Sequence, residues 1–281
     1  MKEVGIASLV LIITNVFCTL RGLNDHFSFK RNNFETGRIL LQKEYRRLIT
    51  AGFFHVSRMH LILNMVTLCF FVAGMGQYLG EARCLFIYFA SLAGGNLFAL
   101  FIYRKEEAYS SAVGASGGVS GAVFAAIALV PGFHIGFLGT NFHLNSWFCG
   151  LLYFLLSIYT VRSKKENIGY ETQLAGGLTG LVIAIIMRPS ALENNYPTIL
   201  AFGGTTALFI YFIITNPRIL LIDNRFFNEQ HLRYTIENIL DQDRDHEQEI
   251  NIILEKIYQN GIGSLSKTDK EKLDHYSRIM Q

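Results

Sequence analysis

The chain has 281 residues, of which 51% are hydrophobic and only 17% are charged, whereas soluble domains carry about 25% charged residues. Too few polar side chains remain to cover a soluble protein of this size, and a net charge of +3 is too small to make nucleic acid the main partner. Disordered, collagen-like and disulfide-scaffold chains are excluded as well. We therefore expect an all-α, multi-pass membrane protein.

Seven apolar stretches approach the roughly 20 residues that a membrane-spanning helix needs. They cover residues 4–20, 58–78, 84–103, 116–137, 147–162, 170–187 and 197–216. The first is kept as a helix because no small-residue cleavage site follows it. Pro131-Gly132 predicts that the regular part of the fourth ends near Val130. The pattern predicts a six-helix bundle with a seventh transmembrane helix.

Two segments outside these stretches differ in composition. Residues 22–55 are polar, aromatic and basic, which predicts a structure lying in the membrane interface rather than a free loop. After Pro217, acidic residues predominate and apolar residues recur with a helical period. We expect residues 1–216 to form the membrane domain and residues 217–281 a small, soluble, acidic, helical tail.

The four cysteines give no sign of a metal or disulfide site. Cys18, Cys69, Cys84 and Cys149 lie in or beside apolar stretches and form no CxxC pair. They are interpreted as small buried hydrophobic residues. Because no cluster of ligands occurs at metal spacing, the sequence implies neither a metal nor a cofactor.

Polar residues recur near the starts of the second, fourth and sixth stretches. Alternate membrane helices start from the same side of the bilayer, so these residues are expected at similar depth. They are His60 and Asn64, then Ser116 and Ser120, then Thr172 and Gln173. Polar side chains at that depth face the bundle interior and are candidates for function.

Two structural alternatives stand beside that interpretation. Small residues spaced four apart let membrane helices approach backbone to backbone. Gly118, Gly121, Gly176 and Gly180 are predicted to pack the fourth helix against the sixth in this way. The serines can also be structural, bonding to carbonyls of their own helix.

Four segments in order resemble the rhomboid family of intramembrane serine proteases over nearly all of residues 40–187. Glu44–Thr50 resembles the family's Trp-Arg segment, with Arg46 where Trp is usual, and His55–Asn64 resembles the His-rich start of the second helix. Gly114-Ala-Ser116-Gly matches the GxSG nucleophile motif, and Gln173–Gly180 matches HxxGxxxG except at its first position. The acidic tail is similar to tails of some bacterial rhomboids.

The resemblance implies a role for each matching residue. Ser116 is the implied nucleophile, and the side chains of His60 and Asn64, with the Ser116 backbone N–H, are the implied oxyanion donors. Ser120 is the alternative nucleophile, because Gly118-Val-Ser120-Gly repeats GxSG one turn later. Ser116 is preferred because it lies nearer the helix start.

The base implied by the resemblance is missing. Gln173 occupies the position of the catalytic histidine, and no histidine occurs between His143 and His231. An amide cannot take the serine proton near neutral pH. Glu171 lies on another helix face, and recruiting His60 would sacrifice its oxyanion role. A substitute base is therefore not favoured.

Two functions remain open. One is a non-catalytic rhomboid-like protein that binds transmembrane segments of other membrane proteins, and the other is an active protease with an unusual base. A transporter is less favoured, because no charged residue lies mid-helix to form an ion path. The resemblance implies a bacterial cytoplasmic membrane. Orientation is open, because the basic loops favour a cytoplasmic site, whereas bacterial rhomboids usually open outward.

Overall fold

A computed structural model describes most of the first 215 residues and part of the remainder. The described residues are 5–104, 110–111, 114–130, 132, 134–136, 143–162, 170–215, 252–266, 268–270 and 273. The chain divides into two compact units, residues 1–220 and 221–281. The expected tail helix before residue 252 lies outside the described residues.

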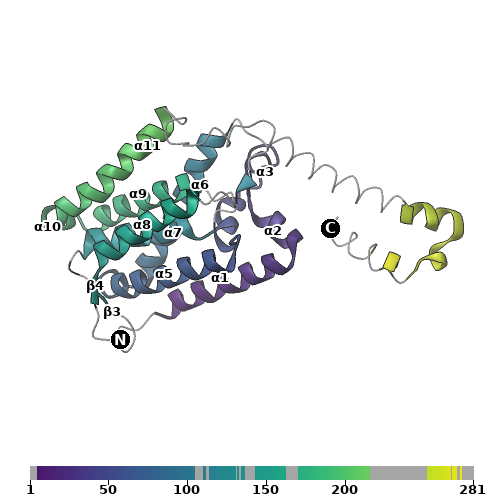
Figure 1. The fold of residues 1–281 in the computed structure, drawn as a ribbon, viewed down its shortest axis with the longest axis horizontal. Coiled ribbons are helices and arrows are strands. Elements are labelled where there is room, and N and C mark those ends of the chain that lie inside the picture. The colour runs from purple at the N-terminus through teal and green to yellow at the C-terminus, as the bar shows by residue number, and fades with distance from the viewer. Residues whose placement is uncertain are drawn as a thin grey trace. The chain divides into compact units, whose positions relative to one another are not determined.

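Helices occur at each of the seven apolar stretches (Figure 1). The first six are α1 (Ile6–Asn24), α5 (Arg58–Leu79), α6 (Glu81–Tyr103), α7 (Ser116–Leu129), α8 (Ser146–Arg162) and α9 (Tyr170–Met187). The last stretch is covered by α10 (Ser190–Ile199), the π-helix η2 (Leu200–Gly204) and α11 (Thr205–Thr215). The last helical segment therefore begins earlier than residue 197.

By length and apolar composition, fewer helices qualify as membrane spans than the seven apolar stretches predict. Among the described residues, α1 and α6 are long and apolar enough to cross a bilayer. A third span is counted if the bent pair Arg47–Phe53 and Arg58–Val72, with an angle of 97°, is one span. Ser116–Leu129 and Glu171–Met187 are shorter apolar helices. The chain is an integral membrane protein, and its seven-span topology stays a prediction.

The segment between α1 and α5 folds into short elements. They are α2 (His26–Asn32), β1 (Phe34–Glu35), α3 (Thr36–Leu40), α4 (Arg47–Thr50) and the 3₁₀ turn η1 (Ala51–Phe53). The fully buried Arg47 donates to the carbonyls of Lys30 (3.0 Å) and Asn33 (2.8 Å) and pairs with Glu44. One guanidinium thus ties α4 to the end of α2.

Two small antiparallel sheets complete the membrane unit. Strand β1 pairs with β2 (Ser110–Ser111), which joins the segment after α2 to the chain that leads into α7. Strands β3 (His134–Gly136) and β4 (His143–Asn145) form the second sheet between α7 and α8.

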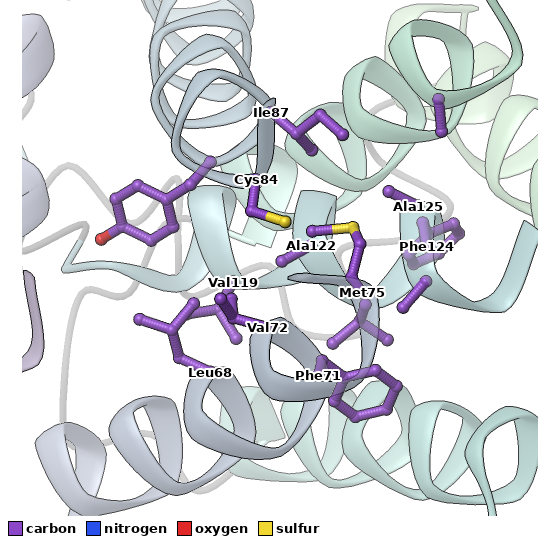
Figure 2. Packing of buried hydrophobic residues seen from close by; sticks show 14 of the residues in the cluster. Leu68, Phe71, Val72, Met75, Cys84, Ile87, Val119, Ala122, Phe124 and Ala125 are labelled. Atoms are coloured by element: carbon purple, nitrogen blue, oxygen red, sulfur yellow. The ribbon is translucent and has the colours of Figure 1, made fainter. Parts of the chain in front are cut away.

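Helix α7 lies at the centre of the membrane unit. It packs against α5, α6 and α9, and 13 of its 14 residues are buried. In Figure 2 its Val119 and Ala122 lie among apolar side chains from two neighbouring helices. Those side chains are Leu68, Phe71, Val72 and Met75 of α5, and Cys84 and Ile87 of α6. The core is therefore built around the helix that starts at Ser116.

Glycines place the backbones of α7 and α9 in contact. A Cβ atom at Gly176 would collide with the Gly117 carbonyl oxygen, and one at Gly180 with that of Gly121. Gly118, expected at the same interface, instead faces the Tyr88 ring of α6. Successive helical residues point about 100° apart, so Gly117 and Gly121 share the face toward α9 and Gly118 turns away from it.

The described part of the second unit is a short helical structure. Residues 252–260 are helical, Gly261 has a φ of 74°, and η4 (Ile262–Ser264) follows. Ser266 and Asp269 then cap each other: the Asp269 carboxylate accepts from the Ser266 N–H at 3.2 Å, and the Ser266 hydroxyl accepts from the Asp269 N–H at 3.1 Å. Ile253 and Leu265 are its buried apolar residues among those described.

Candidate functional site

The starts of α5, α7 and α9 meet at one end of the bundle. A Cβ atom at Gly114, just before α7, would lie 3.2 Å from Cε1 of His60 in α5. A Cβ atom at Gly117 would lie 3.2 Å from the Thr172 carbonyl oxygen in α9. The three groups of polar residues expected at similar depth are thus brought to one region.

The turn before Ser116 requires a glycine. Gly114 has a φ of 59°, and a side chain there would press on the rings of His55 and His60. This left-handed backbone conformation is one that glycine adopts without strain. The turn sets Ser116 as the first residue of α7.

Ser116 and Ser120 are both buried, at 2% and 1% exposure, so burial does not distinguish them. Their backbone groups do differ. The first intrahelical bond of α7 runs from the Val119 N–H to the Ala115 carbonyl at 2.9 Å, so the N–H of Ser116 precedes the helical ladder. Ser120 lies in the second turn, where the N–H belongs to that ladder. An oxyanion donor from the backbone therefore fits Ser116 better than Ser120.

His60 and Asn64 lie one turn apart at the start of α5. The Ser57 hydroxyl caps this helix by accepting from the His60 N–H at 3.3 Å. The Asn64 side chain donates to the His60 carbonyl at 2.9 Å and accepts from the Tyr153 hydroxyl of α8 at 3.4 Å. Among the described residues, no hydrogen-bond partner reaches the buried Nδ1 of His60. Both side chains keep polar atoms in the bundle interior.

His55 is a residue of the site to which sequence reasoning gave no role. Its fully buried ring lies edge-on to the His60 ring, with centroids 5.1 Å apart. Nε2 accepts from the Ala115 N–H at 3.2 Å, and Nδ1 lies 2.8 Å from the Thr19 hydroxyl of α1. Because Nε2 accepts, the ring proton is assigned to Nδ1, which donates to Thr19. The only sequence signal was a histidine five residues before His60.

Gln173 lies in the first turn of α9 and is 6% exposed. Its neighbours Glu171 and Thr172 are buried too. The Thr172 carbonyl faces both Gly117 of α7 and Gly95 of α6, so the start of α9 is wedged between those helices. No group of three potential metal ligands among His, Cys, Asp and Glu occurs in the described part of the chain.

Family comparisons cover both units. The rhomboid domain model matches residues 42–190, which is more than half of the chain. A second model, a family of unknown function (DUF6576), matches residues 234–279.

Three similar proteins come from Arabidopsis thaliana. Rhomboid-like protein 16, chloroplastic, is 43% identical over 75 residues, covering 27% of this chain and 21% of that protein. RHOMBOID-like protein 12, mitochondrial, is 29% identical over 117 residues, covering 40% of this chain and 32% of that protein. RHOMBOID-like protein 6, mitochondrial, is 32% identical over 172 residues, covering 59% of this chain and 52% of that protein.

The alignments thus span between 21% and 52% of these relatives' own lengths. The relatives' names refer to chloroplasts and mitochondria, so they give no support to the bacterial membrane expected from the sequence. The domain match, the apolar helices and the convergence of α5, α7 and α9 agree on one assignment. The chain belongs to the rhomboid family of integral membrane proteins.

Proposed function

We propose that this protein binds transmembrane segments of other membrane proteins and cleaves them weakly or not at all. The observation that carries the proposal is Gln173 in the first turn of α9, where the family resemblance calls for the base. A glutamine amide can hydrogen-bond to a serine hydroxyl but cannot remove its proton near neutral pH. The proposed role keeps the fold and the polar side chains at the starts of α5, α7 and α9 while losing the proton transfer.

The histidines near Ser116 are poor replacements for the missing base. Both ring nitrogens of His55 are engaged, one by the Ala115 N–H and one by Thr19. The buried Nδ1 of His60 has no partner within the described part of the chain, but the ring lies beside the turn that precedes Ser116, on the proposed oxyanion side. If His60 acted as the base, the developing oxyanion would lose one of its hydrogen-bond donors.

The second candidate function is proteolysis with Ser116 as nucleophile and His60 as an unusual base. It is favoured by the convergence of Ser116, His60 and Asn64 at one end of the bundle, and by the buried Nδ1 of His60, for which the described residues offer no partner. Ser120 replaces Ser116 as nucleophile in a variant of the same hypothesis.

A cleavage assay in vesicles with a transmembrane substrate separates the two candidates. We expect negligible cleavage by the natural protein, measurable cleavage by Gln173→His, and no cleavage by Gln173→His combined with Ser116→Ala. Ser120→Ala in the Gln173→His background is the matched control and should retain cleavage. Cleavage by the natural protein that Ser116→Ala abolishes would overturn the non-catalytic proposal.

Binding is tested separately by photo-crosslinking of the same substrate segment. The natural protein and Ser116→Ala should crosslink it equally, because binding does not depend on the hydroxyl acting as a nucleophile. Crosslinking no stronger than that to an unrelated multi-pass protein would contradict the binding role. A folded Gln173→His variant that cleaves nothing would show that the missing base is not what limits activity.

A further inference from the structure

A cavity of about 280 Å³ lies at the end of the bundle opposite Ser116. Its walls come from the last turns of α5 and α7, from the residue after α9, and from the start of α10. The polar residues in its lining are Tyr78, Arg188, Ser190, Asn194 and Asn195, and the apolar ones include Val130. The candidate site described above uses none of these residues.

One wall of the cavity is fixed by a buried hydrogen bond. The Asn195 side chain donates to the Ala128 carbonyl near the end of α7 at 2.7 Å. Asn195 has non-helical backbone angles (φ −134°, ψ 20°), which bend α10 at this contact. The start of α10 is thus held against the end of α7, and the cavity lies between them.

The lining suits a phosphate group. Arg188 is exposed and forms no ion pair within the described chain, so its guanidinium is free to meet an anion. Ser190, Asn194 and Tyr78 add neutral hydroxyl and amide groups beside it. A guanidinium surrounded by neutral donors is a recurrent arrangement for binding phosphate oxygens. Glu193 of α10 is exposed and does not line the cavity.

Apolar side chains continue from the cavity along the helices that form it. Leu192, Tyr196 and Leu200, which lie along α10 and at the start of η2, are 46%, 60% and 65% exposed. On α9, Val182 and Ile186 are exposed one turn apart before Arg188. In an integral membrane protein such side chains contact acyl chains. We propose that the cavity binds the phosphodiester headgroup of a membrane phospholipid, whose acyl chains lie along these helices.

The proposal does not depend on whether the protein cleaves or binds transmembrane segments, because the cavity lies at the other end of α5, α7 and α9. A free phosphate shares the chemistry of the headgroup but lacks acyl chains. Competition between inorganic phosphate and the bound lipid distinguishes these two sources of the phosphate group.

The test is native mass spectrometry of the full-length protein, purified in mild detergent and supplied with phosphatidylglycerol. We expect Arg188→Ala to weaken lipid retention about tenfold, the effect of losing roughly 1.4 kcal/mol of charge-assisted binding. The matched control is Arg83→Ala, which removes an exposed arginine from the start of α6 at the same end of the bundle and should leave retention unchanged. Asn194→Asp, an exposed change that adds a negative charge, should weaken retention even if Arg188→Ala folds poorly.

Inorganic phosphate at millimolar concentration should not displace the lipid. Equal retention by Arg188→Ala and Arg83→Ala would overturn the proposal, as would normal retention by Asn194→Asp. Displacement by inorganic phosphate alone would assign the cavity to a free anion and overturn the lipid site.

Discussion

Thr19 of α1 and His55, which lies between η1 and α5, are joined by a contact of 2.8 Å between Oγ1 and Nδ1. The Thr19 hydroxyl in turn donates to the Phe53 carbonyl at 3.1 Å, while Nε2 of His55 accepts from the Ala115 N–H. These bonds connect the first helix of the bundle to the turn that carries Ser116. Thr19, His55 and Ala115 are all buried, so water does not compete for the bonds.

Replacing Thr19 by Val should lower the stability of the membrane unit. The change keeps the shape of the side chain but leaves the ring N–H of His55 without its acceptor, which costs about 1 kcal/mol. Thr14→Val is the control, because Thr14 is half-buried on the same helix and, among the described residues, its hydroxyl donates to the Val10 carbonyl one turn earlier. Thermal unfolding in detergent should show a lower Tm for Thr19→Val alone. Equal Tm values for the two variants would contradict the role given to this bond.

The close approach of α7 and α9 makes Gly176 intolerant of any side chain. A methyl group there meets the backbone of Gly117, which cannot move without separating the two helices, so Gly176→Ala should destabilise by about 1–3 kcal/mol. No atom of the described residues lies within 4 Å of a Cβ placed at Gly76 of α5, and Gly76→Ala should be neutral or stabilising by up to about 1 kcal/mol. The comparison is made by thermal unfolding of the two variants. A Gly176→Ala protein as stable as the parent would show that the helices are not in backbone contact.

Truncating either of two adjacent arginines to alanine should lower the free energy of unfolding by very different amounts. Arg47 is fully buried and bonds to two carbonyls and to Glu44, whereas the side chain of Arg46 is 50% exposed and reaches Glu44 only at 3.9 Å. Arg47→Ala removes the bonds to both carbonyls and the buried half of the ion pair with Glu44, and should cost about 3–5 kcal/mol. Arg46→Ala should stay within about 0.5 kcal/mol. Chemical unfolding measures both, and similar losses would refute the assignment of Arg47 as the anchor of this segment.

In the second unit, hydrogen bonds from the Ser266 side chain and backbone, with help from Lys256, hold the pKa of Asp269 below its ordinary value. The ionised carboxylate therefore stabilises the cap at pH values above the unfolded pKa of about 3.9. That contribution is lost as the pH falls through the lower folded pKa. Ser266→Ala should raise the pKa of Asp269, measured from the carboxyl ¹³C shift, and Lys270→Ala should leave it unchanged. An unchanged pKa in Ser266→Ala would show that the cap is not responsible.

Much of the helical layout follows from local sequence features. Apolar length predicts helices near residues 58–78, 84–103 and 170–187. Pro131-Gly132 predicts a helix end near Val130, and α7 ends at Leu129. The start of α10 escaped prediction because residues 190–196 are largely polar, so the apolar stretch seemed to begin at residue 197. Their polarity is explained by the buried Asn195 bond and by the cavity that they line.

Long-range contacts at the site escaped prediction for a different reason. The expectation that Gly118 packs against α9 treated every glycine of the motif as equivalent, although Gly117 and Gly121 share the face that meets α9. The role of His55 depends on Thr19, which lies 36 residues earlier in another helix. No spacing rule connects residues that far apart in sequence. The roles of Ser116, Ser120, His60, Asn64 and Gln173 remain predictions for the experiments above.

The shortness of α7 has a consequence for what surrounds it. Fourteen residues of helix rise only about 21 Å, whereas the hydrocarbon core of a bilayer is about 30 Å thick. If the Leu129 end reaches one boundary of the hydrocarbon, Ser116 lies about 9 Å inside the other. Polar groups at that depth must find their hydrogen-bond partners within the protein, away from the lipid. A membrane segment that reaches Ser116 must therefore leave the lipid and enter the interior of the bundle before it touches the serine.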